Sequence, residues 1–177
     1  MKSFFKKIFL SIYSSRFFAR LRKNKISAPL CVKIKIFGKN NKIIIPKNNR
    51  ISKCSVKIFG SNSFLEIGEN NYFNDISFWF EDNNSKIIVG RDNNFCGNIE
   101  IACIEGKTIK IGNDLLVAKN VSIVNGDSHS IVNLAGERQN PSTDISIGNH
   151  VWIGKNVSVL KNGSIGSNVI VGANSLL

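Results

Sequence analysis

Aliphatic β-branched residues recur at every sixth position near the end of the chain. The series begins at Ile147 and continues through Ile153, Val159, Ile165 and Val171, and glycine follows four of these five residues. An α-helix or an ordinary strand does not repeat in this way. Each face of a three-sided parallel β-helix does, because it takes six residues and points one aliphatic side chain into the core. Glycine after the aliphatic residue suits a corner with little room for a side chain. We therefore expect an all-β chain that folds as a left-handed parallel β-helix.

The front half of the chain repeats with a longer period. Segments with core residues six positions apart align with one another at 45–51, 67–73, 89–95 and 111–117. Each copy therefore begins four positions later than three hexapeptides would place it, which predicts a widened corner on every early coil. Coils of this length would also suit a right-handed β-helix. One continuous core favours the left hand throughout, which would be an exception to the right-handed crossover rule.

One segment departs from the repeat. Between Ile123 and Ile145, residues 124–144 contain turn-forming residues and lack the six-residue aliphatic spacing. We expect a loop that protrudes from the solenoid, and binding or catalytic residues often lie on such loops. This loop contains His129, one of only two histidines in the chain.

The basic residues are concentrated at the start of the chain. Residues 1–65 contain sixteen Lys or Arg and no acidic residue, whereas residues 66–177 contain eight basic and twelve acidic residues. Two interpretations are open. The chain has a compositional bias toward Asn, Lys and Ile, or its front half attracts an anionic partner such as a membrane leaflet or an acidic polysaccharide. We expect no nucleic-acid partner.

Residues 2–25 are predicted to form a basic amphipathic helix, because Phe5, Phe9 and Phe17 belong to a series of apolar residues spaced three or four apart. The helix either caps the open end of the solenoid or lies on an anionic membrane. We divide the chain into this helical cap, residues 1–28, and a β-helix domain, residues 29–177.

The cysteines and the hydropathy of the chain indicate its cellular compartment. Four cysteines are scattered without paired spacing, which indicates reduced and mostly buried thiols: Cys31, Cys54, Cys96 and Cys103. The apolar run at residues 8–13 is too short for a signal peptide, and no segment approaches the ~20 apolar residues that span a bilayer. We expect a cytoplasmic protein that at most contacts the inner face of the membrane.

The repeat and the loop together resemble a known family. The segment 147–154, Ile-Gly-Asn-His-Val-Trp-Ile-Gly, is followed by further hexapeptides and preceded by the loop 125–129, Asn-Gly-Asp-Ser-His. Over residues 108–177 the chain resembles the hexapeptide-repeat acyltransferases, and among them the O-acetyltransferases of sugars and bacterial surface polysaccharides. The resemblance implies acetyl-CoA as the acyl donor, direct transfer without an acyl-enzyme, and a homotrimer with three sites between subunits.

Acetylation of a sugar hydroxyl requires a base that takes the hydroxyl proton, and imidazole has a suitable pKa near neutrality. The family places its catalytic histidine on a loop of this kind, so we predict that His129 is the base. Asp127 either orients the imidazole ring or only shapes the turn. His150 lies within the regular repeat and is predicted to be a surface or interface residue.

The resemblance also points to residues that bind the donor. Trp152 is expected to form a wall for the acyl and pantetheine chain beside the histidine of a neighbouring subunit, or else to pack at the interface. By position, backbone groups of Gly154 and Lys155 match the contact to the acetyl carbonyl. Ala173 matches a backbone contact to the pantetheine arm.

Acceptor contacts are proposed from position along the coils. Asn98 and Glu100 precede the loop by one coil, and Asn125 begins it, so all three are candidate contacts to the sugar. Exposed strand positions are the alternative for Asn98 and Glu100. No catalytic metal is expected: γ-class carbonic anhydrases share the left-handed β-helix but need three zinc-binding histidines, and this chain has two.

These features together predict an acetyl-CoA-dependent O-acetyltransferase that acts on a sugar hydroxyl of a capsular, lipopolysaccharide or sialic-acid-containing glycan. An N-acetyltransferase acting on an amino-sugar nucleotide is an alternative. A truncated, non-catalytic solenoid is another, because the chain ends at Leu177 within a hexapeptide. Relatives continue with further coil and a basic tail that helps to bind coenzyme A. If the chain ends there naturally, we expect weak donor binding.

Overall fold

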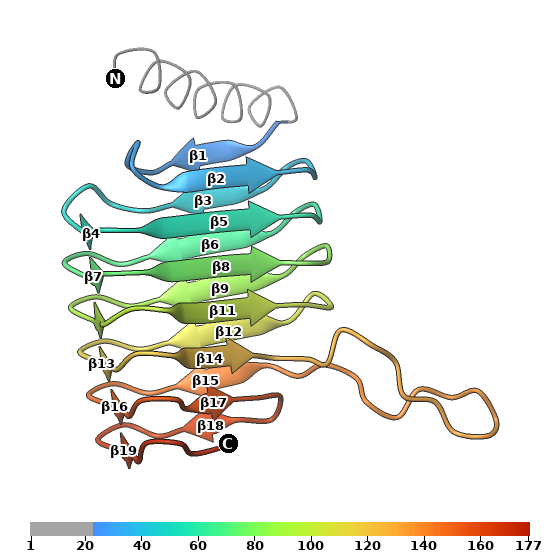
Figure 1. Ribbon diagram of the computed structural model, residues 1–177. Helices are drawn as coiled ribbons and strands as arrows, with labels where there is room; N and C mark the ends of the chain where they lie inside the picture. Colours follow the sequence, from blue (N-terminus) through green and yellow to red (C-terminus); the bar gives the residue numbers. More distant parts are fainter. Residues whose placement is uncertain (1–22) are drawn as a thin grey trace, which may run out of the picture.

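The computed structural model describes residues 23–177, and these residues wind into a solenoid of parallel strands (Figure 1). Every ladder between named strands is parallel, and the strands form three sheets, one for each face of a triangular prism. In Figure 1 the strands nearest the viewer run rightward while the chain descends, which is the left-handed sense. The structure is therefore a left-handed parallel β-helix, as the sequence predicts.

We call the three sheets faces A, B and C, and from β2 onward each coil visits them in the order B, A, C. Face A holds seven strands: β1 (Lys25–Ser27), β3 (Lys42–Ile44), β6 (Phe64–Ile67), β9 (Lys86–Val89), β12 (Thr108–Ile111), β15 (Ile145–Ile147) and β18 (Ser164–Ile165). Face B holds six: β2 (Lys33–Ile36), β5 (Cys54–Ile58), β8 (Ile76–Phe80), β11 (Ile99–Cys103), β14 (Val121–Val124) and β17 (Ser158–Val159). Face C also holds six: β4 (Arg50–Ile51), β7 (Tyr72–Phe73), β10 (Asn94–Phe95), β13 (Leu116–Val117), β16 (Trp152–Ile153) and β19 (Ile170–Val171).

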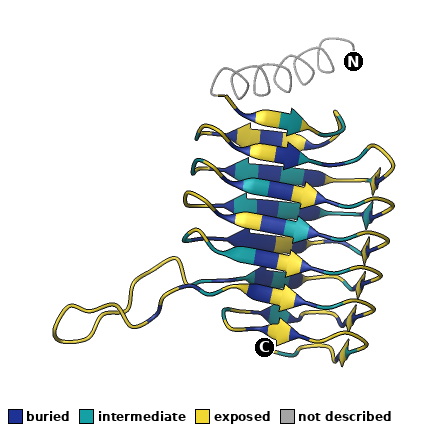
Figure 2. Ribbon diagram, turned by 180° about the vertical axis from the view of Figure 1, so that it is seen from behind, coloured by how far each residue is buried: buried dark blue, intermediate teal, exposed yellow. Residues whose placement is uncertain are grey.

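The predicted aliphatic ladder lines the interior of the prism. All five residues of the six-residue series are buried, from 0% exposure at Ile153 and Val159 to 7% at Val171. Figure 2 shows the resulting alternation of buried and exposed positions along the strands. The earlier coils add aromatic rings to the same core, where the Phe73 and Phe95 centroids lie 5.3 Å apart. The core is therefore continuous from the longer early coils to the hexapeptide coils at the end of the chain.

The prediction of a widened corner is mostly wrong, because the additional residues lengthen two of the three faces. Strands on face B have five residues in β5, β8 and β11 but two in β17. Strands on face A have four residues in β6, β9 and β12 but two in β18. Longer faces enclose a wider core, which gives room for the phenylalanine rings of the early coils. From β2 to β14, the offset between coils departs from the repeat once, on face B. Cys54 pairs with Ile76, but Ile76 pairs with Ile99, which lies one position later than the repeat predicts and follows Gly97, whose φ is 125°.

Asparagine is a structural residue of this solenoid. Asn49, Asn71 and Asn93 are buried one above another between faces A and C. The Asn71 amide donates to the carbonyl oxygens of Gly68 and Gly90, at 3.0 Å each, and its oxygen accepts the Asn93 N–H at 2.9 Å. Ten further asparagines adopt a positive φ at corners, a conformation that asparagine tolerates better than most residues. Much of the compositional bias toward asparagine therefore has a role in the fold.

The start of the chain is described only from residue 23. The predicted helix over residues 2–25 lies almost wholly outside the described residues, and so does most of the predicted cap. Within the cap's last residues the structure places β1, which pairs in parallel with β3, so solenoid pairing begins at Lys25 instead of near residue 30. Over residues 23–177, no helix is long and apolar enough to cross a membrane.

Candidate functional site

The predicted loop extends from the solenoid at the corner between faces B and A. It leaves β14 at Asn125 and returns to β15 after Asp144. Figure 1 shows it projecting well beyond the prism, and Figure 2 shows that most of its residues are exposed. Its outer part is a hairpin, in which Val132 and Arg138 form an antiparallel bridge and Gly136 turns with a φ of 81°.

Asn125 anchors the start of this loop to the previous coil. It is fully buried, its side-chain oxygen accepts the Ile104 N–H at 2.8 Å, and its amide donates to the carbonyl oxygens of Ile104 and Thr143. A side chain with these three partners and no exposed surface is not available to a sugar. The predicted contact of Asn125 with the acceptor therefore lacks a free side chain in this structure, where Asn125 holds the start of the loop.

Asn140 is the centre of a hydrogen-bond network at the base of the loop. Its amide donates to the Asp127 Oδ2 and to the His129 carbonyl oxygen, both at 2.7 Å. Its own oxygen accepts the Ile131 N–H at 2.6 Å. Because Asn140 is only 6% exposed, water competes little for these hydrogen bonds. They fix the loop backbone at His129 and Ile131.

Two ion pairs connect the loop to the solenoid. Asp127 pairs with Lys161, in the turn between β17 and β18, and Arg138 pairs with Glu105, in the turn between β11 and β12. The ammonium group of Lys161, followed by the Asn140 amide, lowers the pKa of the Asp127 carboxyl group below its ordinary value. The Arg138 guanidinium does the same for the pKa of Glu105. Both carboxylates thus remain charged at neutral pH.

The imidazole ring of His129 has no hydrogen-bond partner among residues 23–177. The residue is exposed, its carbonyl oxygen is held by Asn140, and no hydrogen bond between described residues involves its ring nitrogens. Asp127 does not bond to the ring: its Oδ2 is occupied by Lys161 and Asn140. In this structure Asp127 holds the loop, and its predicted role in orienting the imidazole lacks a contact.

A groove of about 290 Å³ lies on the outside of face B, beside the start of the loop. We call it the face B groove, and its lining residues are Trp79, Glu81, Glu100, Ala102, Ile104, Val124 and Ser128. Ser128 precedes His129 and places its hydroxyl 3.4 Å from Glu81. Because Glu100 lines the same groove, a molecule bound there beside the loop would contact the Glu100 carboxylate. Asn98 does not line the groove: it turns the corner before β11 and donates to Asn120 at 2.8 Å.

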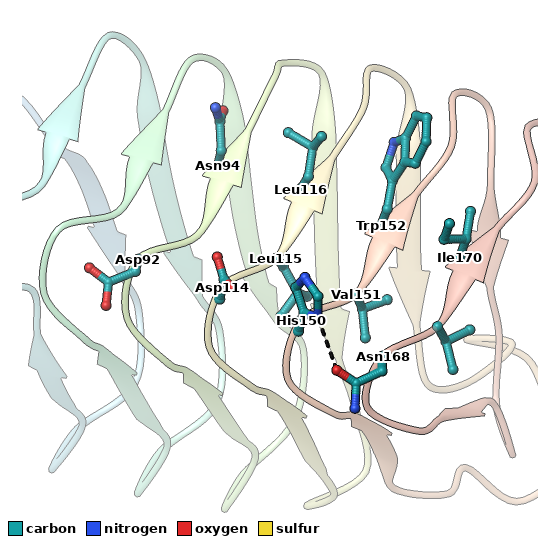
Figure 3. A pocket seen from close by; sticks show the side chains of 11 residues that line it. Asp92, Asn94, Asp114, Leu115, Leu116, His150, Val151, Trp152, Asn168 and Ile170 are labelled. Carbon is teal, nitrogen blue, oxygen red and sulfur yellow. Dashed lines mark hydrogen bonds between the residues drawn. The ribbon is translucent and has the colours of Figure 1, made fainter.

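A larger pocket of about 510 Å³ lies on face C, which we call the face C pocket (Figure 3). Leu116, Trp152 and Ile170 are adjacent across β13, β16 and β19, and they are 43%, 50% and 71% exposed. They form an apolar wall, below which Asp114 and His150 project from the turns. The His150 Nδ1 lies 2.9 Å from the Asn168 Oδ1, on the surface.

Gly154 and Ala173 are stacked in successive coils just beyond this wall. A Cβ atom at Gly154 would lie 2.6 Å from the Ala173 nitrogen, so the close approach of the coils requires glycine there. The Gly154 N–H donates to the Val171 carbonyl oxygen at 2.9 Å and is not available to an acyl oxygen. The predicted backbone contact of Gly154 to the donor therefore lacks a free N–H group in this structure. No hydrogen bond between described residues involves the Lys155 N–H.

The structure groups the predicted site residues into two sets within one chain. His129, Asp127 and Glu100 lie on or beside face B and the loop. Trp152, Gly154, Lys155 and Ala173 lie on face C and at its following corner. Among residues 23–177, no group of three or more His, Cys, Asp or Glu side chains could hold a metal ion.

The residues that hold the loop were not predicted from the sequence. Lys161 lies 34 residues after Asp127, and Arg138 lies 33 residues after Glu105. No local spacing marks such pairs. Asn140 precedes the only proline of the loop, Pro141, and that dipeptide is the one local sign of a turn at this position.

Comparison with known proteins gives consistent results. Residues 144–177 match the family described as bacterial transferase hexapeptide (six repeats). The polysialic acid O-acetyltransferase of Neisseria meningitidis is 47% identical over 57 residues, which are 32% of this chain and 26% of that protein. The galactoside O-acetyltransferase of Escherichia coli (strain K12) is 31% identical over 86 residues, which are 48% of this chain and 41% of that protein. The matches thus span about a quarter and two fifths of these curated relatives.

Two solved structures are similar over most of this chain. The polySia-specific acetyltransferase NeuO has a TM-score of 0.74 at 28% identity, with 86% of this chain and 65% of that chain covered. The polysialic acid O-acetyltransferase OatWY has a TM-score of 0.78 at 31% identity, with 87% of this chain and 75% of that chain covered. In fold, repeat and sequence, the chain belongs to the hexapeptide-repeat acyltransferase family.

Proposed function

We propose that this chain is an acetyl-CoA-dependent O-acetyltransferase that modifies a sugar hydroxyl of a bacterial surface polysaccharide, with His129 as the general base. The observation that carries the proposal is the free imidazole of His129 on a loop whose backbone is fixed by Asn140. The names of the relatives support the reaction class, since all four are acetyltransferases and three of the names specify O-acetyl transfer.

The chemistry follows from this arrangement. A ring nitrogen of His129 takes the proton of the attacking hydroxyl, which makes the oxygen a stronger nucleophile. Glu100, in the adjoining face B groove, is suited to accept a hydrogen bond from a neighbouring hydroxyl of the same sugar. Acetyl-CoA, when bound, would supply the acyl group to the hydroxyl oxygen directly: the C–S bond would break as the ester bond forms, and the proton held by His129 would pass to the departing thiolate of coenzyme A.

The face C side of the chain fits the donor. The apolar wall of Leu116, Trp152 and Ile170 suits a long and mostly apolar arm such as pantetheine. Because the Gly154 N–H bonds to the Val171 carbonyl oxygen, the Lys155 N–H is the better candidate to donate a hydrogen bond to the acyl oxygen. Ala173, stacked on Gly154, keeps its proposed contact to the arm.

A site that combines these two sets needs two copies of the chain. Within one chain the donor wall lies on face C, whereas His129 lies on a loop that projects away from the corner of faces A and B. A projecting loop can reach a neighbouring molecule. We therefore propose a homotrimer, in which His129 of one copy meets Trp152 of the next at each of three sites.

Product analysis tests the proposed reaction. The full chain is incubated with acetyl-CoA and one of three acceptors: a sialic acid polymer, a neutral galactoside or an amino-sugar nucleotide. We expect an ester product, which mild alkali cleaves. An alkali-stable amide would indicate N-acetylation instead. A chain that neither transfers acetyl groups nor binds coenzyme A would be a non-catalytic solenoid.

Subunit mixing tests the shared site. Trimers of His129→Ala alone or of Trp152→Ala alone should both be impaired. Mixed trimers restore sites that pair an intact His129 with an intact Trp152, so activity should recover on co-refolding. Absence of recovery, with both variants trimeric, would contradict a site between copies.

A further inference from the structure

Lysine and aromatic side chains form a continuous column on the outside of face B. Lys35 of β2, Lys57 of β5 and Trp79 of β8 are direct neighbours across the parallel ladder. The Lys57 Nζ lies 4.3 Å from the Trp79 ring centroid and 4.6 Å from that of Phe59. We call Lys35, Lys57, Phe59 and Trp79 the lysine–aromatic strip.

The strip continues into the face B groove without a break. Trp79 belongs to both, and the next residues in its column are Ala102 of β11 and Val124 of β14. Since parallel strands lie about 4.8 Å apart, Lys35 is roughly 10 Å from Trp79, and Val124 is roughly 10 Å further on. Because Ala102 has a small side chain, it does not obstruct the path between Trp79 and Val124. The path ends beside Ser128, the residue before His129.

The strip carries positive charge that no ion pair within the described part of the chain neutralises. None of the ion pairs among residues 23–177 includes Lys35 or Lys57. The rings of Phe59 and Trp79 hold the Lys57 ammonium group in place while leaving its charge intact. An ammonium group that is fixed in this way and faces solvent is prepared to meet an anion.

We infer that the lysine–aromatic strip binds a distal, anionic part of the acceptor polymer, whose chain crosses the strands of face B from Lys35 down to His129. This inference rests on the proposed function, because it assumes that His129 acts on a sugar of the same polymer. A polysaccharide with repeated carboxylates fits this surface: its charges meet Lys35 and Lys57, and its apolar sugar faces pack on Phe59 and Trp79. The carboxylates of Glu81 and Glu100, by contrast, lie at the end of the path, where only sugar hydroxyls need to bind.

The shape of the strip favours a polysaccharide over an anionic membrane. Trp79 is half-buried and Phe59 is only 38% exposed, so neither ring projects far above the sheet. Insertion into a bilayer needs apolar side chains that protrude beyond their surroundings. The strip is also narrow, since Lys35, Lys57 and Trp79 form one column with Phe59 beside it, which suits a single extended chain.

A binding experiment with matched variants tests the inference. The full chain is titrated with a fluorescent sialic acid polymer, a single sialic acid sugar and neutral dextran, and KM and kcat are measured with the polymer. One variant is Lys35→Gln with Lys57→Gln, and a second is Trp79→Ala. The control is Lys42→Gln with Phe64→Ala, which removes a cation and its ring, 5.3 Å apart, from face A.

We expect the double lysine variant to bind the polymer about five-fold more weakly, as for the loss of two exposed ion contacts. Its KM for the polymer should rise by a similar factor while kcat stays unchanged. Binding of the single sugar should not change, and the face A control should resemble the wild type. Weaker binding on Trp79→Ala would support the same conclusion.

Several results would overturn the inference. Wild-type protein that does not bind the polymer, or an equal loss of affinity in the face A control, would exclude a specific strip. A lysine variant that loses affinity for anionic vesicles but not for the polymer would assign the strip to a membrane. Polymer binding that depends on the strip, in a protein with no transferase activity, would refute the proposed function and leave the binding surface standing.

Discussion

Asn140 offers the sharpest test of how the loop presents His129. Asn140→Ala removes the bond to the His129 carbonyl oxygen at 2.7 Å and the bond from the Ile131 N–H at 2.6 Å. The substitution also removes the bond to the Asp127 Oδ2, which Lys161 still pairs. A hydrogen bond in a folded protein contributes about 1 kcal/mol net, so the two bonds to the loop backbone contribute about 2 kcal/mol to the closed loop base. That free energy corresponds to a roughly 30-fold increase in the population of locally opened loop.

Amide hydrogen exchange measures this opening directly. Exchange at the Ile131 and Gln139 N–H groups should accelerate about 30-fold, because the Gln139 N–H donates to the Ile131 carbonyl oxygen. Exchange in the solenoid strands should not change. The kcat for acetyl transfer should fall, since His129 no longer has a fixed backbone, while the melting temperature stays close to that of the wild type.

Asn133→Ala is the matched control, because it makes the same chemical change in the same loop. Asn133 holds only the hairpin tip, where its oxygen accepts the Ala135 and Glu137 N–H groups. It should loosen the tip and leave kcat unchanged. The reasoning is refuted if Asn140→Ala preserves both Ile131 exchange and kcat, or if Asn133→Ala lowers kcat as strongly.

Three further predictions concern stability and reactivity. Asn71→Ala leaves the Gly90 carbonyl oxygen and the Asn93 N–H group without partners, whereas the Gly68 carbonyl oxygen keeps its bond from Asn49, so denaturant titration should show a loss of about 3 kcal/mol in the free energy of unfolding. Because Lys161 and Arg138 lower the pKa values of Asp127 and Glu105, the loop anchors should persist at neutral pH and fail only as the pH falls through these lowered values, below the ordinary carboxyl range; limited proteolysis of the loop against pH reports this. Burial raises the pKa of Cys54 to about 12, so at pH 8 a thiol reagent should modify exposed Cys31 quickly and Cys54 only after unfolding; mass mapping of the labelled peptides distinguishes them.

The solenoid was predictable because its core residues recur at regular intervals along the sequence. Each core residue stacks on an equivalent residue one coil away, so the shorter and the longer repeat of the sequence become the pairings Trp152 with Ile170 and Lys35 with Lys57. The distribution of the four additional residues was not predictable in the same way. Sequence offsets measure the length of a coil but not whether its strands or its corners are longer.

The site was only partly predictable, because its contacts are not periodic. The irregular segment identified the loop and His129, and Glu100 lies in the adjoining groove as its position one coil earlier suggests. Asn125, however, is an asparagine whose hydrogen-bond partners are Ile104, in the previous coil, and Thr143, at the far end of the loop. The Gly154 N–H donates to the carbonyl oxygen of Val171 in the next coil, so it is not free to bind the acyl donor.

The rate of acetyl transfer by His129→Ala tests the central claim most directly. With acetyl-CoA and the acceptor that the wild type uses best, removal of a general base should lower kcat by about 10²–10⁴-fold. The fold and the affinity for coenzyme A should be retained. His150→Ala, which removes the only other histidine, should transfer acetyl groups at the wild-type rate. A His129→Ala variant with wild-type kcat would contradict the account.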